Sequence, residues 1–235
     1  MLYQNAKELF DKIEINLTQN MFDNFNTYQK ELIEWNNNIN LTTITEDNEV
    51  WLKHFVDSCT ISKYIKENDS VIDVGTGAGF PGIPVRIIKD IKITLLDSLN
   101  KRINFLNEVC DKCNLKDVNT VHGRAEDFGK DKKHREQYDI ATARAVANLS
   151  TLLEYCLPFV KVNGSFICMK SSDCDEEIND AKHALEELGG KIEIIENITL
   201  PDSDIKRKII VIKKTKPTPS KYPRKAGIPA KQPIA

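Results

Sequence analysis

Glycine recurs at every second position after Asp73, at Gly75, Gly77 and Gly79. Glycine weakens the interior of a strand, so strand packing does not explain this spacing. It is typical of a turn whose backbone takes unusual dihedral angles and approaches a ligand closely. A short apolar run precedes the turn and a helix-like segment follows it. We therefore expect a ligand-binding loop between a strand and a helix, with Asp73 orienting the loop or receiving an amino group of the ligand.

A carboxylate, Asp97, ends the next apolar run, about 20 residues after the glycines. A glycine-rich turn followed at this distance by an acid is typical of nucleoside recognition, in which the acid binds the ribose hydroxyls. The spacing here is G-x-G-x-G, whereas pyrophosphate binders use G-x-G-x-x-G. This difference favours an adenosyl cofactor without phosphates, S-adenosylmethionine, and disfavours a nicotinamide-dependent oxidoreductase.

A third element, Ala125-Glu126, follows the apolar run that ends at Val121. A small residue and a carboxylate at this place suit the edge of an adenine ring. The alternative is a helix start with acids near its positive end. The register of this pair with the first two elements favours a role in cofactor binding.

Cationic side chains mark the other candidate positions. Arg144 lies among small residues at the predicted end of a strand, where its planar fork could bind a phosphate, a carboxylate or a guanine edge. A structural ion pair is the alternative. Lys101 and Arg102 stand near a helix start and suit a phosphate or a solvated face. His54 is structural or lies on a segment that folds over the cofactor pocket.

The elements that must position these residues form two parts. Helices are expected over residues 3–17, 20–38 and 46–63, and strands and helices alternate from residue 70 onward. The expected strands cover residues 71–74, 92–96, 118–121, 138–142, 164–169, 191–198 and 206–212. This order predicts an α/β fold with a doubly wound, mostly parallel seven-stranded sheet and an antiparallel last strand. We divide the chain into a helical N-terminal extension (1–66), a cofactor-binding domain (67–214) and a C-terminal tail (215–235).

Charge is distributed unevenly. The net charge is −2, yet the residues from Ile205 onward include ten Lys and Arg and no acid. Prolines stiffen this end, and Tyr222 offers a group on which a base could stack. The pattern favours a tail that binds nucleic acid, with a solvated C-terminus as the alternative.

Other features bear on membrane association, localisation, metal binding and oligomeric state. No apolar run approaches 18 residues, so no membrane span is expected. The six scattered cysteines are expected to be reduced thiols of a cytoplasmic protein. Cys110 and Cys113 have no second pair nearby, so no metal site is expected. Nothing in the sequence demands a dimer, and we expect a monomer.

Taken in order, several motifs resemble the glucose-inhibited division protein B family, bacterial 16S ribosomal RNA guanine-N7 methyltransferases. The matching segments are Trp35-Asn36, Asn40-Leu41-Thr42, His54-Phe55-Val56-Asp57-Ser58, Asp73–Pro84, Leu95–Arg102, Arg124–Asp127, Ala143-Arg144-Ala145, Met169-Lys170 and Tyr222–Pro229. Two departures are modest, since Lys53 precedes His54 where the family often has Arg, and Ser171-Ser172 follows Lys170 where it often has Gly.

The resemblance implies an S-adenosylmethionine-dependent enzyme of the class I methyltransferase fold. The implied cofactor residues are Gly75, Phe80, Asp97, Ala125, Glu126 and Arg144. It also implies a guanine acceptor in the decoding-region stem-loop of 16S rRNA in the small ribosomal subunit. On that basis we expect RNA contacts from His54, Lys101, Arg102, Lys170, Arg224 and Lys225.

Guanine N7 has a lone pair and no proton, so attack on the methyl group needs positioning rather than a general base. As the catalytic residue, Arg144 is expected to clamp O6 or a phosphate, and an acidic pocket could retain the charge that develops on the purine. The alternatives are a methyltransferase for another RNA, a protein or a small molecule, and a non-catalytic RNA-binding protein.

Overall fold

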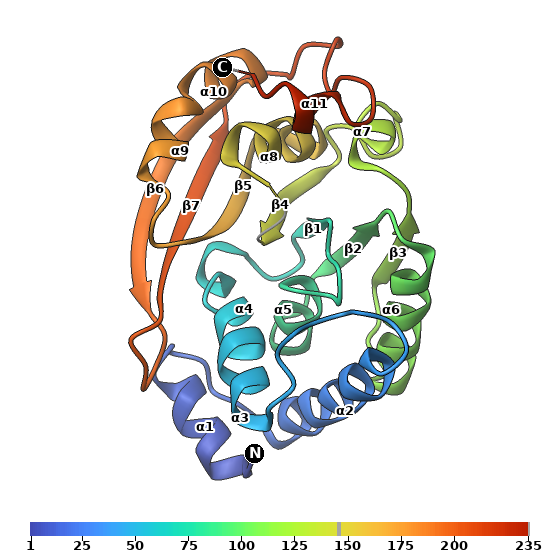
Figure 1. Cartoon of the computed structure of the whole chain (residues 1–235), viewed down its shortest axis with the longest axis vertical. Helices are drawn as coiled ribbons and strands as arrows, with labels where there is room; N and C mark the ends of the chain where they lie inside the picture. The colour runs from blue at the N-terminus through green and yellow to red at the C-terminus, as the bar shows by residue number, and fades with distance from the viewer. Residues whose placement is uncertain (145–146, 235) are drawn as a thin grey trace.

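A seven-stranded sheet organises the chain, for which the computed structural model describes residues 1–144 and 147–234 (Figure 1). The strands are β1 (Ser70–Val74), β2 (Lys92–Asp97), β3 (Val118–His122), β4 (Tyr138–Arg144), β5 (Val160–Ser171), β6 (Gly190–Thr199) and β7 (Lys206–Lys214). Their spatial order is β3-β2-β1-β4-β5-β7-β6. The first strand, β1, therefore lies inside the sheet, with β2 and β3 on one side of it and β4 and the later strands on the other. The boundary between β1 and β4 is a topological switch point, which is where α/β sheets bind ligands.

The strand directions confirm the predicted fold class. Strands β1 to β5 pair in parallel, and β7 runs antiparallel between β5 and β6. The predicted hairpin of the last two strands is present. Because the last strand inserts beside β5, its first residues reach the same edge as the carboxyl end of β5, where Arg207 pairs with Ser171.

Alternate side chains of each central strand enter two hydrophobic clusters on opposite faces. Leu95 points to one face and Leu96 to the other. Both faces are covered, which explains why these strands appear in the sequence as near-continuous apolar runs.

The helices are α1 (Tyr3–Asp11), α2 (Gln19–Asn36), α3 (Asp47–Val50), α4 (Asp57–Cys59), α5 (Gly82–Ile88), α6 (Asn100–Lys112), α7 (Ala125–Phe128), α8 (Leu149–Cys156), α9 (Asp175–Asp180), α10 (Lys182–Leu188) and α11 (Ile228–Lys231).

The N-terminal helices pack directly on one face of the sheet. Phe10, Phe25, Trp51 and Phe55 are fully buried and share a single cluster with strand residues such as Leu95. The helix expected over residues 3–17 ends at Asp11. The helix expected over residues 46–63 is divided into α3, a π-helical segment over 51–56 and α4, followed by a separate short turn, and the rings of Trp51 and Phe55 pack edge to face within the π-helical segment.

The C-terminal segment, which we define as residues 215–234, folds back onto the domain. Tyr222 and Ile234 are buried in the cluster that also holds α8, and α11 lies against α8 (Figure 1). This packing excludes the alternative of a fully solvated C-terminus. Tyr222 is only 8% exposed, so the prediction that it offers a stacking face is wrong for this arrangement. Local sequence could not reveal this, since the partners of the segment lie far away along the chain.

Candidate active site

The glycine loop has the backbone that its sequence predicts. Gly75, Gly77 and Gly79 have φ angles of 71°, 61° and 96°, a region that side chains disfavour. A Cβ at Gly79 would also lie 2.8 Å from the hydroxyl of Tyr28. That hydroxyl donates a hydrogen bond to the carbonyl oxygen of Ala78, so the N-terminal helix α2 holds the loop from behind.

Asp73 orients this loop from beneath. Its Oδ2 accepts hydrogen bonds from the hydroxyl of Thr76 at 2.6 Å and the backbone N–H of Gly82 at 2.9 Å. Its Oδ1 has no partner among the described residues. Complete burial raises the pKa of Asp73 to about 6, an effect that the two hydrogen bonds only partly oppose. Of the two roles expected for Asp73, these contacts support the orientation of the loop.

A cavity of about 220 Å³, which we call the Asp97 cavity, lies at the carboxyl ends of β1, β2 and β3. It brings together five of the predicted site residues, namely Gly75, Asp97, Arg102, Ala125 and Glu126. Asp97 accepts hydrogen bonds from the backbone N–H groups of Gly77 and Leu99, each at 2.9 Å, and forms an ion pair with Arg102 at 3.2 Å. The acid therefore connects the glycine loop to the start of α6.

Glu126 links this cavity to the C-terminal segment. The side chain is buried, and its Oε1 accepts a hydrogen bond from the backbone N–H of Gly227 at 2.9 Å. Tyr155 of α8 lines the same cavity. The C-terminal segment thus stabilises the wall opposite the glycine loop.

A second cavity of about 590 Å³, the Arg144 cavity, continues along the same edge of the sheet at the ends of β4, β5 and the start of β7. Arg144 is held on several sides. Its Nη1 donates to the carbonyl of Lys53 at 3.2 Å and approaches Asp57 Oδ2 at 3.4 Å, and its Nη2 donates to His54 at 3.1 Å. The guanidinium also lies 4.7 Å from the centre of the Phe80 ring, which favours a cation at that place.

These contacts fix the protonation state of His54. A guanidinium can only donate, so Nδ1 of His54 is the acceptor, and Nε2 keeps its proton and donates to the hydroxyl of Thr42 at 2.7 Å. Burial, and secondarily the charge of Arg144, lowers the pKa of His54 to about 3. Its ring stacks on Phe80 at 4.4 Å. His54 is therefore a neutral positioning group near physiological pH.

Asp57 and Arg207 also line the Arg144 cavity, although neither was expected from the sequence to have a role there. Burial raises the pKa of Asp57, while Arg144 and Arg207 oppose the shift. Arg207 Nε donates to Asp57 Oδ2 at 3.2 Å, so one carboxylate holds two guanidinium groups. Asp57 stands one helical turn after His54, a spacing that could have revealed it. Arg207 depends on the register of β7 against β5, for which the sequence has no signal.

Lys170 lines the same cavity but is already paired. Its Nζ donates to the carbonyl of Ala147 at 2.7 Å and forms an ion pair with Glu177 at 2.5 Å. Four cationic side chains and two carboxylates line the cavity, as Lys53, Arg144, Lys170 and Arg207 outnumber Asp57 and Glu177. The expectation of an acidic pocket is therefore wrong for this cavity, which instead suits an anionic acceptor.

Three predicted RNA contacts lie outside both cavities. Lys101 and Lys225 are exposed. Arg224 pairs with Glu154 at 2.6 Å, and Glu154 is completely buried. This pairing argues against Arg224 as a phosphate contact and gives it the role of an anchor. Ala145, part of the motif around Arg144, lies outside the described residues.

Three other cavities of the described chain are not lined by residues of the glycine loop. One of them, of about 640 Å³, lies between the end of α1 and the carboxyl end of β6, and its Lys12 and Lys63 are ion-paired to Asp202 and Glu196. Over residues 1–144 and 147–234, no cluster of three or more His, Cys, Asp or Glu side chains is arranged to hold a metal ion. Within the same ranges, no helix has the length and apolar character of a membrane span. All six cysteines are unbridged and buried.

Solved structures with the same fold are methyltransferases and related proteins. A methyltransferase from Aquifex aeolicus described as S-adenosylmethionine-dependent matches 71% of this chain and 93% of its own, with 18% identity and a TM-score of 0.53. The M. jannaschii protein TYW2, solved with the same cofactor, matches 66% of this chain with 17% identity and a TM-score of 0.52. The likeness shows that the chain shares the fold of these methyltransferases.

Sequence comparison gives the family. The chain belongs to the GidB family, described as rRNA small subunit methyltransferase G, whose family model matches residues 21–206. A protein of that name from Alkaliphilus metalliredigens is 54% identical over all of this chain and 98% of its own length. Another from Acetivibrio thermocellus is 57% identical over 94% of this chain and 91% of its own length. The family resemblance and the S-adenosylmethionine cofactor expected from the sequence are confirmed.

Proposed function

We propose that the protein transfers a methyl group from S-adenosylmethionine to N7 of a guanine in the decoding-region stem-loop of 16S rRNA. The observation that supports this most is the placement of two cavities along one edge of the sheet, with the glycine loop at one and a clamped arginine at the other. The first suits a nucleoside without phosphates and the second suits an anionic, base-bearing acceptor.

The Asp97 cavity fits an adenosyl group. An ionised carboxylate has about four acceptor positions, and Asp97 uses three, for Gly77, Leu99 and Arg102. One position remains for a ribose hydroxyl. Glu126 gives the same cavity a second carboxylate, beside Arg102 and Arg124. We assign the adenine edge to Ala125 and Glu126 and the close backbone contact to Gly75.

Phe80, Gly77 and Gly79 act on the cofactor indirectly in this proposal. Phe80 lies between the rings of Tyr28 and His54 and contacts the guanidinium of Arg144. It therefore helps to position His54 and Arg144. Gly77 donates to Asp97, and Gly79 allows Tyr28 to approach the loop. Each of them shapes the site through a neighbour.

In the Arg144 cavity the acceptor base is positioned by cations. S-adenosylmethionine supplies an electrophilic methyl group, and guanine N7 supplies its own lone pair. Arg144 or Arg207 donates to O6 or to a phosphate, which leaves N7 free to react. His54 cannot take up a proton easily, because Nδ1 is occupied and Nε2 is already protonated. This arrangement agrees with a reaction that needs no general base.

Substrate and setting follow from the same proposal. The acceptor is 16S rRNA, free or within the small subunit, which places the enzyme in the cytoplasm with the ribosome. We propose that it acts as a monomer, because the exposed large apolar side chains of the described residues are few and mostly scattered.

Radiolabelled methyl transfer to different acceptors tests this function. Small ribosomal subunits that lack the modification should be labelled, whereas large subunits, bulk protein and free nucleosides should not. Transfer to a protein or a nucleoside in preference to the subunit would contradict the proposal. Heat-treated enzyme and the Arg144→Ala variant serve as controls for contaminating activity.

A further inference from the structure

We propose that the Lys130–Lys133 loop and the C-terminal segment together form one docking surface for the phosphate backbone of folded RNA. We call it the basic surface and define it by its exposed lysines, Lys130, Lys132, Lys133, Lys216, Lys225 and Lys231. The RNA class rests on the proposed function. The surface itself rests on contacts that join two segments far apart in the sequence.

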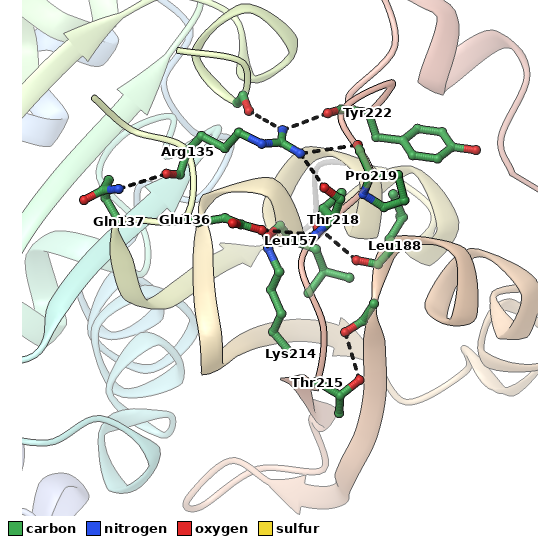
Figure 2. Close-up of polar contacts among 12 residues, drawn as sticks. Arg135, Glu136, Gln137, Leu157, Leu188, Lys214, Thr215, Thr218, Pro219 and Tyr222 are labelled. Carbon is green, nitrogen blue, oxygen red and sulfur yellow. Dashed lines mark hydrogen bonds and ion pairs between the residues drawn. The ribbon is translucent and has the colours of Figure 1, made fainter. Parts of the chain in front are cut away.

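Arg135 joins the two segments. Its Nη1 donates to the carbonyl of Gly129 and to that of Tyr222, each at 2.8 Å, and its Nη2 donates to the carbonyls of Thr218 at 2.7 Å and Pro219 at 3.3 Å. Figure 2 shows this guanidinium reaching from one strand-connecting loop into the C-terminal segment. One side chain therefore fixes the Lys130–Lys133 loop beside the segment that follows β7.

Glu136 strengthens the same junction. Its Oε1 accepts from Lys214 Nζ at 2.7 Å and from the backbone N–H of Thr218 at 3.1 Å (Figure 2). Pro223 packs so closely on Gly129 that a Cβ there would lie 3.0 Å from its ring. Because both segments are held by these contacts, the lysines project from a preorganised support rather than from a loose tail.

Four acids beside the C-terminal segment bind groups of that segment or of the strand before it, whereas Asp127 and Asp131, in and beside the Lys130–Lys133 loop, are exposed. Glu126 accepts from the backbone of Gly227, Glu136 from Lys214, and Glu154 from Arg224. Glu187 pairs with Lys221. The carboxylates therefore neutralise the anchors of the C-terminal segment and leave its outer lysines uncompensated.

The ten cations counted from Ile205 onward differ in their roles, and Lys206 and Lys213 belong to β7 itself. Five form ion pairs and hold the fold, namely Arg207, Lys208, Lys214, Lys221 and Arg224. Over residues 1–144 and 147–234, the six lysines of the basic surface have no ion-pair partner, three of them from this tail and three from the distant loop. Uncompensated lysines on a fixed support are the composition expected for a surface that contacts phosphates.

The partner expected for the basic surface is a polyanion that the surface recognises by its charge rather than by its bases. The aromatic ring of this region, Tyr222, is buried and covered by Lys221 at 5.0 Å, so it does not stack on a base. Gly227 contacts Glu126, which lines the Asp97 cavity, so the surface borders the cofactor end of the active site. RNA held there would contribute affinity and orientation, while the base is selected in the Arg144 cavity.

Charge reversal in each half of the surface tests the inference. The two variants are K130E/K132E/K133E and K216E/K225E/K231E. A matched control, K66E/K92E/K116E, makes the same charge change at exposed lysines beside the amino ends of β1, β2 and β3. Binding of small subunits is measured by filter retention at several salt concentrations, with methyl transfer measured in parallel.

Both surface variants should bind small subunits about tenfold or more weakly at moderate salt, with a shallower dependence of affinity on salt, because several phosphate contacts are lost. Their affinity for S-adenosylmethionine and their thermal midpoints should match the control. Subunit binding equal to the control in both variants would overturn the inference and leave the proposed function intact. Wild-type enzyme that binds subunits through these lysines but transfers no methyl group would instead overturn the proposed function alone.

Discussion

Arg144 shows how much depends on one side chain. It connects β4 to the N-terminal helices through Lys53, His54 and Asp57, and it covers Phe80 beside the glycine loop. The sequence indicated this arginine through its small neighbours and the predicted strand end. The partners that hold it come from a segment about 90 residues earlier, and only the packing of that segment on the sheet brings them into reach.

His54→Asn should flatten the dependence of stability on pH. Wild-type His54 has a pKa of about 3 in the folded state against 6.5 as its ordinary value, so the unfolded chain binds more protons between those limits. Stability is therefore lost as the pH falls from about 6.5, by at most about 1.4 kcal/mol per pH unit for one proton. Asn keeps an acceptor for Arg144 and does not titrate.

Urea unfolding at pH 4.5, 5.5 and 6.5 measures this difference. Asp73, whose pKa is raised to about 6, has the opposite effect, because its folded form binds more protons between about 3.8 and 6. That contribution is common to both proteins and cancels in the comparison. Equal pH slopes for wild type and variant would show that folding does not lower the pKa of His54.

Asp97→Ala should weaken binding of S-adenosylmethionine about 10- to 100-fold. The variant loses the acceptor proposed for the ribose and also the anchors of Gly77 and Leu99. Isothermal calorimetry measures the change. Asp97→Asn keeps one acceptor oxygen and should lose less. Unchanged affinity in Asp97→Ala would remove this residue from the cofactor site.

At the scale of elements, the strands were predictable and the C-terminal segment was not. Strands covered on both faces form continuous apolar runs between turn residues, as in β1 and β2, and this signal is local. The segment after β7 has the prolines and lysines of a linker. Its docking depends on Arg135 and Glu154, which are separated from it by about 70 to 90 residues, so local sequence could not predict it. The position of Arg207 likewise needed the antiparallel register of β7.

Arg224→Ala should lower the thermal midpoint by roughly 5–10 °C. It leaves the completely buried Glu154 without its ion-pair partner, a loss of about 2–3 kcal/mol once the remaining bond from the backbone N–H of Arg224 is considered. The neighbouring Lys225→Ala is the control, because Lys225 is exposed.

Differential scanning calorimetry separates these two roles. Lys225→Ala should keep the wild-type midpoint and weaken RNA binding slightly, since it removes one proposed phosphate contact. Arg224→Ala should lose stability first. Equal midpoints for the two variants would mean that the Glu154 ion pair does not anchor the segment.

At the scale of the whole molecule, one edge of the sheet organises the proposed activity. The Asp97 cavity and the Arg144 cavity lie along this edge, and the C-terminal segment reaches the Asp97 cavity through the contact of Gly227 with Glu126. The N-terminal helices support the two cavities from one face through Tyr28 and His54, and the C-terminal segment supports the Asp97 cavity through Glu126. The fold class and the glycine loop were predictable from sequence, whereas the placement of the cavities and of the C-terminal segment depends on long-range packing.

The most direct test of the account is the identity of the methylated atom. Small subunits lacking the modification are incubated with the enzyme and labelled S-adenosylmethionine, and the 16S rRNA is digested to nucleosides after the labelled region has been mapped. The account predicts label in N7-methylguanosine from the decoding-region stem-loop. Label in another nucleoside or region, or no transfer while calorimetry shows normal cofactor binding, would contradict it.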